Sequence, residues 1–144
     1  MYGLRPEYPT ANLDITGTPK MAFVEVDTVQ PTLRWEPFPD ADARKADRDG
    51  RLNRIRDVSY DLRIFGAEHD HPTEVLYARS ELSEPSHKVE TALMPAAKYF
   101  WTVRARFMLD GVTRVTPWAR ILGSGSSDFV APSRYYFGLK TPAR

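Results

Sequence analysis

The chain of 144 residues contains no cysteine. This absence excludes disulfide bonds, thiolate nucleophiles and cysteine-ligated zinc or iron–sulfur sites. It selects no compartment, because a reducing cytosol and a bacterial periplasm both accommodate a domain whose core needs no covalent cross-link. The sequence also lacks an apolar run near the ~20 residues of a membrane helix. Its first residues lack a signal-peptide pattern. Whether a leader or lipid anchor was removed ahead of them stays open.

Net charge is also nearly absent. Twenty Lys and Arg residues against nineteen Asp and Glu residues leave a formal charge of +1. No global field therefore favours nucleic acid or an anionic membrane as a partner, and any charge-driven binding must be local. The sequence contains no Gly-x-Ser-x-Gly elbow, no His-Glu-x-x-His motif and no phosphate-binding loop. We therefore expect a protein that is not an enzyme and that holds no cofactor.

The sequence does contain short segments of alternating polarity, separated by turn residues. The clearest are residues 58–65 and 99–107, in which every second side chain is apolar or aromatic. About seven such segments, without a convincing amphipathic helix, predict an all-β sandwich. Residues 1–20 differ, because they contain three prolines and no lasting apolar period. They predict a Pro-rich N-terminal tether, followed by one domain over residues 21–144.

The residues before the strongest strand show a family resemblance. Leu93 and Pro95 stand six and four positions before Tyr99, and Trp35 and Tyr60 occupy two earlier strands. Over residues 30–141 this pattern resembles a fibronectin type III domain. The resemblance implies a seven-stranded antiparallel immunoglobulin-like sandwich in which the Tyr99 hydroxyl bonds to upstream backbone. The structural core that it implies consists of Leu33, Trp35, Tyr60, Leu62, Leu93, Pro95, Tyr99, Trp101 and Val103.

Two connections are longer than such a fold requires, namely residues 40–57 and 110–134. The resemblance places both at the same pole of the sandwich, where long loops on a rigid scaffold often bind partners. The alternative is neutral drift, because lengthening a surface loop costs little entropy. The candidate binding residues on these loops are Arg51, Arg54, Arg56, Arg114, Trp118, Arg120 and Phe129.

The sequence leaves two functions open. The first is a noncatalytic protein-binding or spacer module that uses both loops, in a periplasmic, lipid-anchored or secreted bacterial protein, as the resemblance implies. The alternative is a carbohydrate-binding module that uses Trp118, Phe129 and the neighbouring arginines. The partner's identity and the oligomeric state are not encoded in any recognisable motif.

Metal binding is considered at two places and expected at neither. An EF-hand around Gly50 fails because Lys45 and Arg56 stand where acidic ligands are needed. A looser calcium site remains open on the aspartates of the same loop, which are Asp40, Asp42, Asp47 and Asp49. Interleaved basic residues oppose this site and favour a solvated loop. His69 and His71 have the spacing of half a zinc site, but an exposed turn is favoured because further ligands are not evident.

Overall fold

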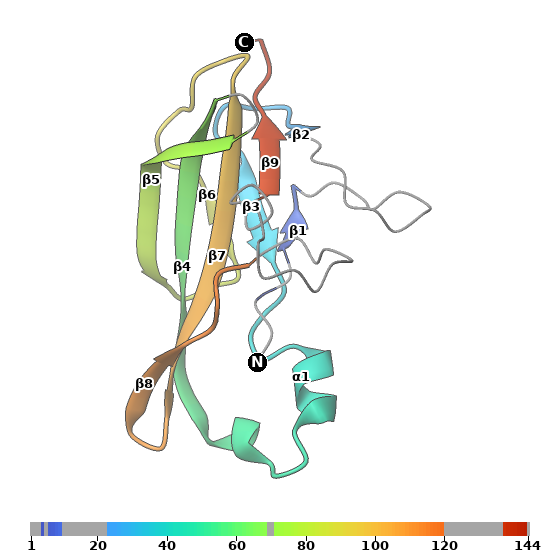
Figure 1. The fold of residues 1–144 in the computed structure, drawn as a ribbon, viewed down its shortest axis with the longest axis vertical. Helices are drawn as coiled ribbons and strands as arrows, with labels where there is room; N and C mark the ends of the chain where they lie inside the picture. Colours follow the sequence, from blue (N-terminus) through green and yellow to red (C-terminus); the bar gives the residue numbers. More distant parts are fainter. Residues whose placement is uncertain (1–3, 5, 10–22, 69–70, 120–136, 144) are drawn as a thin grey trace.

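The structure is a computed structural model that describes residues 4, 6–9, 23–68, 71–119 and 137–143 (Figure 1). Its strands are β1 (Pro6–Tyr8), β2 (Phe23–Glu25), β3 (Thr32–Trp35), β4 (Ile55–Glu68), β5 (His71–Leu82), β6 (Ser86–Lys88), β7 (Lys98–Leu109), β8 (Val112–Val115) and β9 (Phe137–Lys140). Its helical segments are α1 (Ala41–Ala46) and η1, a 3-10 turn (Arg51–Arg54).

The strands form two sheets, which confirms the all-β prediction. One sheet has the order β1-β3-β6, and the other has the order β2-β9-β7-β4-β5 with β8 also paired to β7. The described residues thus contain nine strands where seven were predicted. The two additional strands are β1, within the predicted tether, and β8, within the predicted long loop 110–134.

The core lies between the two sheets. Alternate residues of β3, Leu33 and Trp35, face alternate residues of β4 and β7, and the rings of Trp35 and Tyr60 meet edge-on with centroids 5.5 Å apart. Strand alternation therefore identified most of the core correctly. The predicted residues that are buried are Leu33, Trp35, Tyr60, Leu62, Tyr99, Trp101 and Val103. Two predicted core residues differ, because Leu93 is only partly buried and Pro95 is exposed in a turn.

Tyr99 fixes the segment that precedes β7. The backbone N–H of Met94 donates a hydrogen bond of 2.8 Å to the Tyr99 hydroxyl, while the ring is buried in the core. The same segment is fastened to the C-terminal residues, because the N–H of Ala97 donates to Thr141 Oγ1 at 2.9 Å. The predicted bond between the Tyr99 hydroxyl and upstream backbone is thus confirmed.

Residues 110–119 are not part of a long loop, and this part of the prediction is wrong. Asp110 and Gly111, with φ angles of 52° and 79°, close a tight hairpin between β7 and β8. The chain then continues along β7, because Thr116 N–H donates to Ala105 O at 2.9 Å and Ala119 N–H donates to Val103 O at 2.8 Å. Paired left-handed residues match the twist of a two-residue hairpin, which explains why the turn forms here.

The other predicted loop, residues 40–57, begins with the short helix α1 and continues through η1 into β4. In Figure 1, α1 and η1 lie at the end of the molecule that also carries the β7–β8 hairpin and the start of β4. The described part of the N-terminal segment lies on the domain. Leu4 is buried, β1 pairs with β3, and the indole N–H of Trp101 donates to Pro9 O at 3.2 Å.

Candidate interaction surface

The α1 helix begins at Asp40 for a local electrostatic reason. The carboxylate of Asp40 accepts a hydrogen bond of 2.7 Å from the N–H of Ala43, which caps the first turn of the helix. Such a cap satisfies an amide that would otherwise have no intrahelical partner, and it contributes about 1 kcal/mol. The charge of Asp40 is therefore directed toward the helix backbone.

Asp47 has the same role for the following turn. Its two carboxylate oxygens accept hydrogen bonds from the N–H groups of Arg51 and Leu52, at 3.1 and 2.9 Å. Gly50 precedes this turn with a φ of 70°, a conformation that costs a glycine little. Two of the aspartates considered for calcium thus bind backbone amides. The side chain of Asp42 lies outside the described residues, and Asp49 is exposed.

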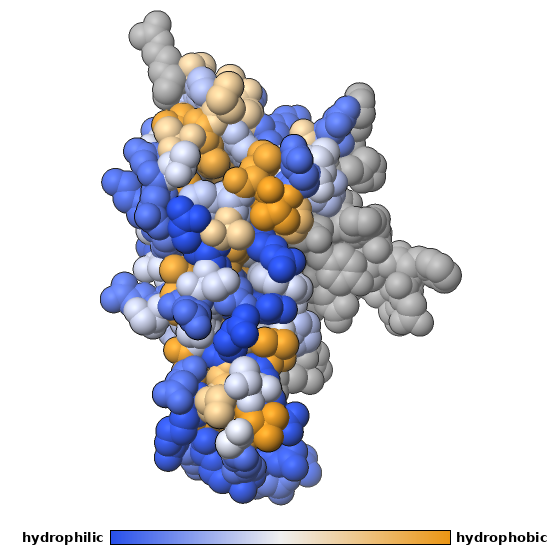
Figure 2. All heavy atoms as spheres, turned by 90° about the vertical axis from the view of Figure 1, so that its left-hand side faces the viewer, coloured by the Kyte–Doolittle hydropathy of each residue, from blue (hydrophilic) through white to orange (hydrophobic). Residues whose placement is uncertain are grey.

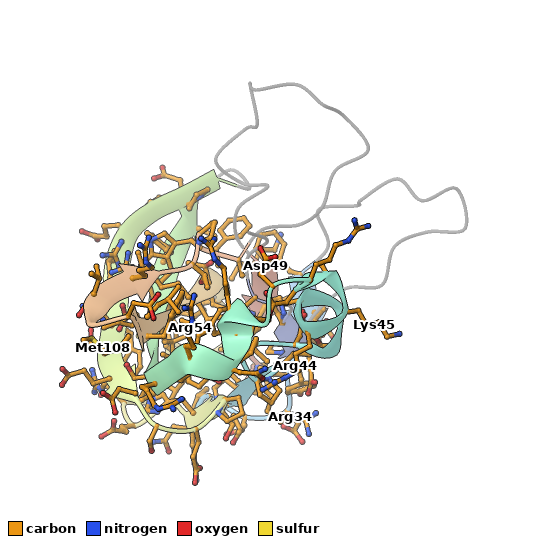
Figure 3. All side chains as sticks on the ribbon, turned by 90° about the horizontal axis from the view of Figure 1, so that it is seen from below. Arg34, Arg44, Lys45, Asp49, Arg54 and Met108 are labelled. Carbon is orange, nitrogen blue, oxygen red and sulfur yellow. The ribbon has the colours of Figure 1, made fainter. Side chains whose placement is uncertain are left out.

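The cations of the same segment point outward instead. Arg44, Lys45, Arg48 and Arg51 are all exposed, and we call these four residues the basic pole. No ion pair of their side chains occurs among the described residues. Figure 3 looks onto this end of the molecule and shows Lys45 pointing away from it. Two carboxylates of the segment, those of Asp40 and Asp47, therefore accept from backbone amides, whereas its four cations and Asp49 lie in solvent.

Two other predicted binding residues of this segment already have partners. Arg54 forms an ion pair of 3.4 Å with Asp110, at the turn between β7 and β8. Arg56 donates to the backbone carbonyls of Asn53 and Ile55, at 3.1 and 3.0 Å. Both side chains are exposed, so each contributes positive charge while it also braces the backbone around η1.

Trp118 lies elsewhere, on the outer face of the six-stranded sheet. The guanidinium groups of Arg63 and Arg104 lie over its ring, 4.5 and 4.4 Å from the centroid. Arg104 Nε and Arg106 Nη2 each donate to Asp61 Oδ2 at 2.9 Å. Burial raises the pKa of Asp61, but its hydrogen bonds and charge contacts with the two arginines outweigh burial and bring that pKa below its usual range.

The structure does not unite the predicted binding residues in one rim. Arg54 pairs with Asp110, which follows Leu109 at the end of β7. Trp118 precedes Ala119, whose N–H donates to Val103 O farther back along β7. Six residues of strand separate these positions along β7, which corresponds to about 20 Å. Arg114 is exposed on β8 opposite Phe107. The remaining two predicted residues, Arg120 and Phe129, lie outside the described residues.

Sequence reasoning missed the cluster on the outer face. Asp61 and Arg63 alternate on β4, and Arg104 and Arg106 alternate on β7, so each pair shares one face of its strand. That alternation was the available signal. The cross-strand pairing of Asp61 with Arg104 depends on the strand register, which the sequence alone does not specify.

Comparisons with known proteins add no family: no family model, no curated protein and no solved structure matches this chain. Within the described ranges, no group of three metal-ligating side chains is found. Across the same ranges, no helix is long and apolar enough to span a membrane.

Proposed function

We propose that the chain is a fibronectin type III-like module that binds an acidic surface of another protein through the basic pole. The proposed family is supported by the Tyr99 hydrogen bond to Met94 and by the neighbouring order of β9, β7, β4 and β5 in one sheet and of β3 and β6 in the other. Because this fold serves many functions, the binding role has to be argued from a site.

The separation of charge between residues 40 and 51 is the observation that supports the role most strongly. If the segment were only a solvated loop, its aspartates would be expected to pair with its own arginines. Instead, Asp40 and Asp47 accept bonds from backbone amides, and the four cations of the basic pole are exposed. Ordered capping also limits the entropy that the segment would lose on binding.

The magnitude of the effect is modest for each residue. An exposed ion pair contributes about 0.2–1 kcal/mol, so four such pairs would add about 1–4 kcal/mol. Charges of this kind act strongly on the association rate and on specificity, and salt screens them within about 10 Å at 0.1 M. We therefore expect a partner whose binding weakens as the ionic strength rises.

One observation favours a protein over a glycan bound by Trp118. A sugar ring stacks on an open aromatic face, but Trp118 is only partly exposed and two guanidinium groups lie over its ring. Displacing them would cost two cation–π contacts of about 0.5–2 kcal/mol each. The described residues thus support the carbohydrate alternative less well than protein binding.

The proposal is tested with a variant in which Arg44, Lys45, Arg48 and Arg51 are all replaced by Gln. Wild-type and variant protein are used as baits in extracts of the source cells, and bound proteins are compared quantitatively. A control replaces Arg34, Lys88 and Arg114 by Gln, which removes three exposed cations from other surfaces. We expect the pole variant alone to lose a specific partner. Equal capture by all three baits would contradict the proposal.

A further inference from the structure

Three arginines and a tryptophan gather on the outer face of the six-stranded sheet, away from the basic pole. Arg63 lies on β4, and Arg104 and Arg106 lie on β7, at positions that alternate with the core residues Leu62 and Val103. Cross-strand register places Asp61 beside Arg104. We call Arg63, Arg104, Arg106 and Trp118 the arginine face.

The arginine face has too few carboxylates for its cations. Within the part of the chain that the structure describes, Asp61 is its one acidic partner, and a single oxygen of Asp61 accepts from both Arg104 and Arg106. The Asp61 side chain is 5% exposed, whereas the side chains of Arg104 and Arg106 are 24% and 39% exposed. Arg63 is exposed as well. An approaching molecule therefore meets guanidinium groups and not the carboxylate, and the local charge is about +2 because Asp61 stays ionised.

The guanidinium groups are held in place before any partner binds. Asp61 orients Arg104 and Arg106 through hydrogen bonds of 2.9 Å, and Trp118 orients Arg63 and Arg104 through ring contacts. A surface whose long side chains are already ordered loses less entropy on association. Tryptophan and arginine are also the residue types that contribute most to binding at protein interfaces.

Apolar side chains flank the arginine face on two sides. Val115 of β8 lies directly opposite Arg106 and is 46% exposed. On β5, Ala78 lies opposite Arg63, and Leu76, two residues from Ala78 along the strand, is 52% exposed. Figure 2 views the side of the molecule that carries β5 and β8, where apolar side chains form small patches among hydrophilic ones. A charged centre with apolar flanks fits a protein surface better than a uniformly polar polyanion.

We propose that the arginine face is a second docking surface, and that its occupant is an acidic segment of a partner protein. Carboxylates of that segment would pair with Arg63 and with the exposed end of Arg106, while its apolar residues would contact Val115 and Leu76. Charge complementarity identifies the class of partner, because the unbalanced charge of the face is positive. The inference does not depend on binding at the basic pole.

The test is an NMR titration of isotope-labelled full chain with a synthetic ten-residue glutamate peptide in dilute buffer. We expect shifts of the Trp118 indole N–H and of the Nε–H signals of Arg63 and Arg106. Arg63→Gln should weaken the affinity about fivefold, which corresponds to the loss of one exposed charge pair. Arg114→Gln makes the same change in charge on the exposed strand β8 and should leave the shifts at Trp118 intact.

Three results would overturn the inference. Shifts confined to residues 40–51 would place acidic binding at the basic pole alone, and no shift anywhere would remove acidic binding at both surfaces. A sulfated tetrasaccharide that binds at Trp118 more tightly than the glutamate peptide would identify the face as a glycan site. Because Arg63→Gln could disturb Trp118, Arg106→Gln serves as a second variant, since Arg106 makes no ring contact with Trp118 within the described residues. Its loss should weaken peptide binding about as much as Arg63→Gln. Asp61→Asn is unsuitable here, because it also removes the acceptor that orients Arg104 and Arg106.

Discussion

The hydroxyl oxygen of Tyr77 lies 2.6 Å from Nε2 of His87, and this contact joins β5 of one sheet to β6 of the other. The N–H of Glu90 donates to the same hydroxyl at 3.1 Å, which leaves the hydroxyl hydrogen for His87. The Glu90 carboxylate in turn accepts from Arg79 Nε at 3.0 Å, and the Arg79 guanidinium lies over the Tyr77 ring. With Nε2 of His87 unprotonated, the Tyr77 hydroxyl donates to it, and the lowered pKa of His87 favours this form in the folded state.

This link predicts that acid destabilises the fold. Burial lowers the pKa of His87 below its usual range, Arg79 adds to the effect, and Glu90 opposes it. The neutral form of His87 is thus favoured in the folded state. Its contribution to stability is fully present above the unfolded pKa of about 6.5 and is lost as pH falls through the folded pKa. Urea unfolding at pH 7.5 and pH 5 measures this loss.

His87→Gln is the matched variant, because glutamine can accept from Tyr77 but does not titrate. We expect its free energy of unfolding to change less between pH 7.5 and pH 5 than that of the wild type. An equal change in the free energy of unfolding in wild type and variant would show that another group causes the acid sensitivity.

Tyr99→Phe should destabilise the fold by about 1 kcal/mol. The substitution keeps the buried ring but leaves the Met94 N–H without its acceptor. Denaturant unfolding measures the change. Tyr8→Phe is the control, since the Tyr8 hydroxyl makes no hydrogen bond within the described residues. Equal destabilisation by the two variants would contradict the role given to Tyr99.

Asp61→Asn should destabilise the fold at pH 7 by about 2 kcal/mol. It leaves Arg104 and Arg106 adjacent without a counter-charge, and the partial exposure of both arginines keeps the cost below that of a fully buried pair. Because the pKa of Asp61 is lowered in the folded state, its contribution is present above the unfolded pKa of about 4 and disappears as pH falls through the folded pKa. Wild type and variant should therefore approach each other in stability under strong acid, which unfolding curves at pH 7 and pH 3 measure.

Asp47→Ala should loosen η1 without unfolding the domain. The amides of Arg51 and Leu52 would lose their acceptor, and their hydrogen exchange should rise about tenfold, as for the loss of a helix cap. Asp49→Ala removes an exposed carboxylate from the same segment and should leave that exchange unchanged. Equal protection in the two variants would remove the ordering role given to Asp47.

Alternation along single strands made β4 and β7 predictable, because core side chains recur at every second position. The spacing of Leu93 and Tyr99 likewise predicted a bond that the structure contains. Asp110-Gly111 is a tight-turn signal in the sequence, but the sequence predicts a loop over residues 112–119 because they show no clear apolar alternation. Their pairing with β7 is set by the turn at Asp110 and Gly111 and not by an apolar pattern of their own.

The directions of the side chains in the candidate surfaces depend on backbone geometry, which composition alone does not specify. The segment from 40 to 51 reads as mixed charge, and only the turn conformations show that Asp40 and Asp47 face amides while Arg44 and Arg48 face solvent. On the outer face of the six-stranded sheet, the fold gathers Arg63, Arg104 and Arg106 around the single carboxylate of Asp61, although the whole sequence is nearly neutral.

The central claim is that another protein contacts the basic pole, and site-directed photo-crosslinking in the source cells tests it most directly. A photoreactive amino acid replaces Arg48, which is exposed beyond α1, and the control positions are Glu84 and Thr113, both exposed on other segments. Binding at the pole predicts a discrete adduct from position 48 that is absent from the control positions and that disappears when Arg44 and Arg51 are also replaced. Adducts from positions 84 or 113 but not from 48 would contradict the claim.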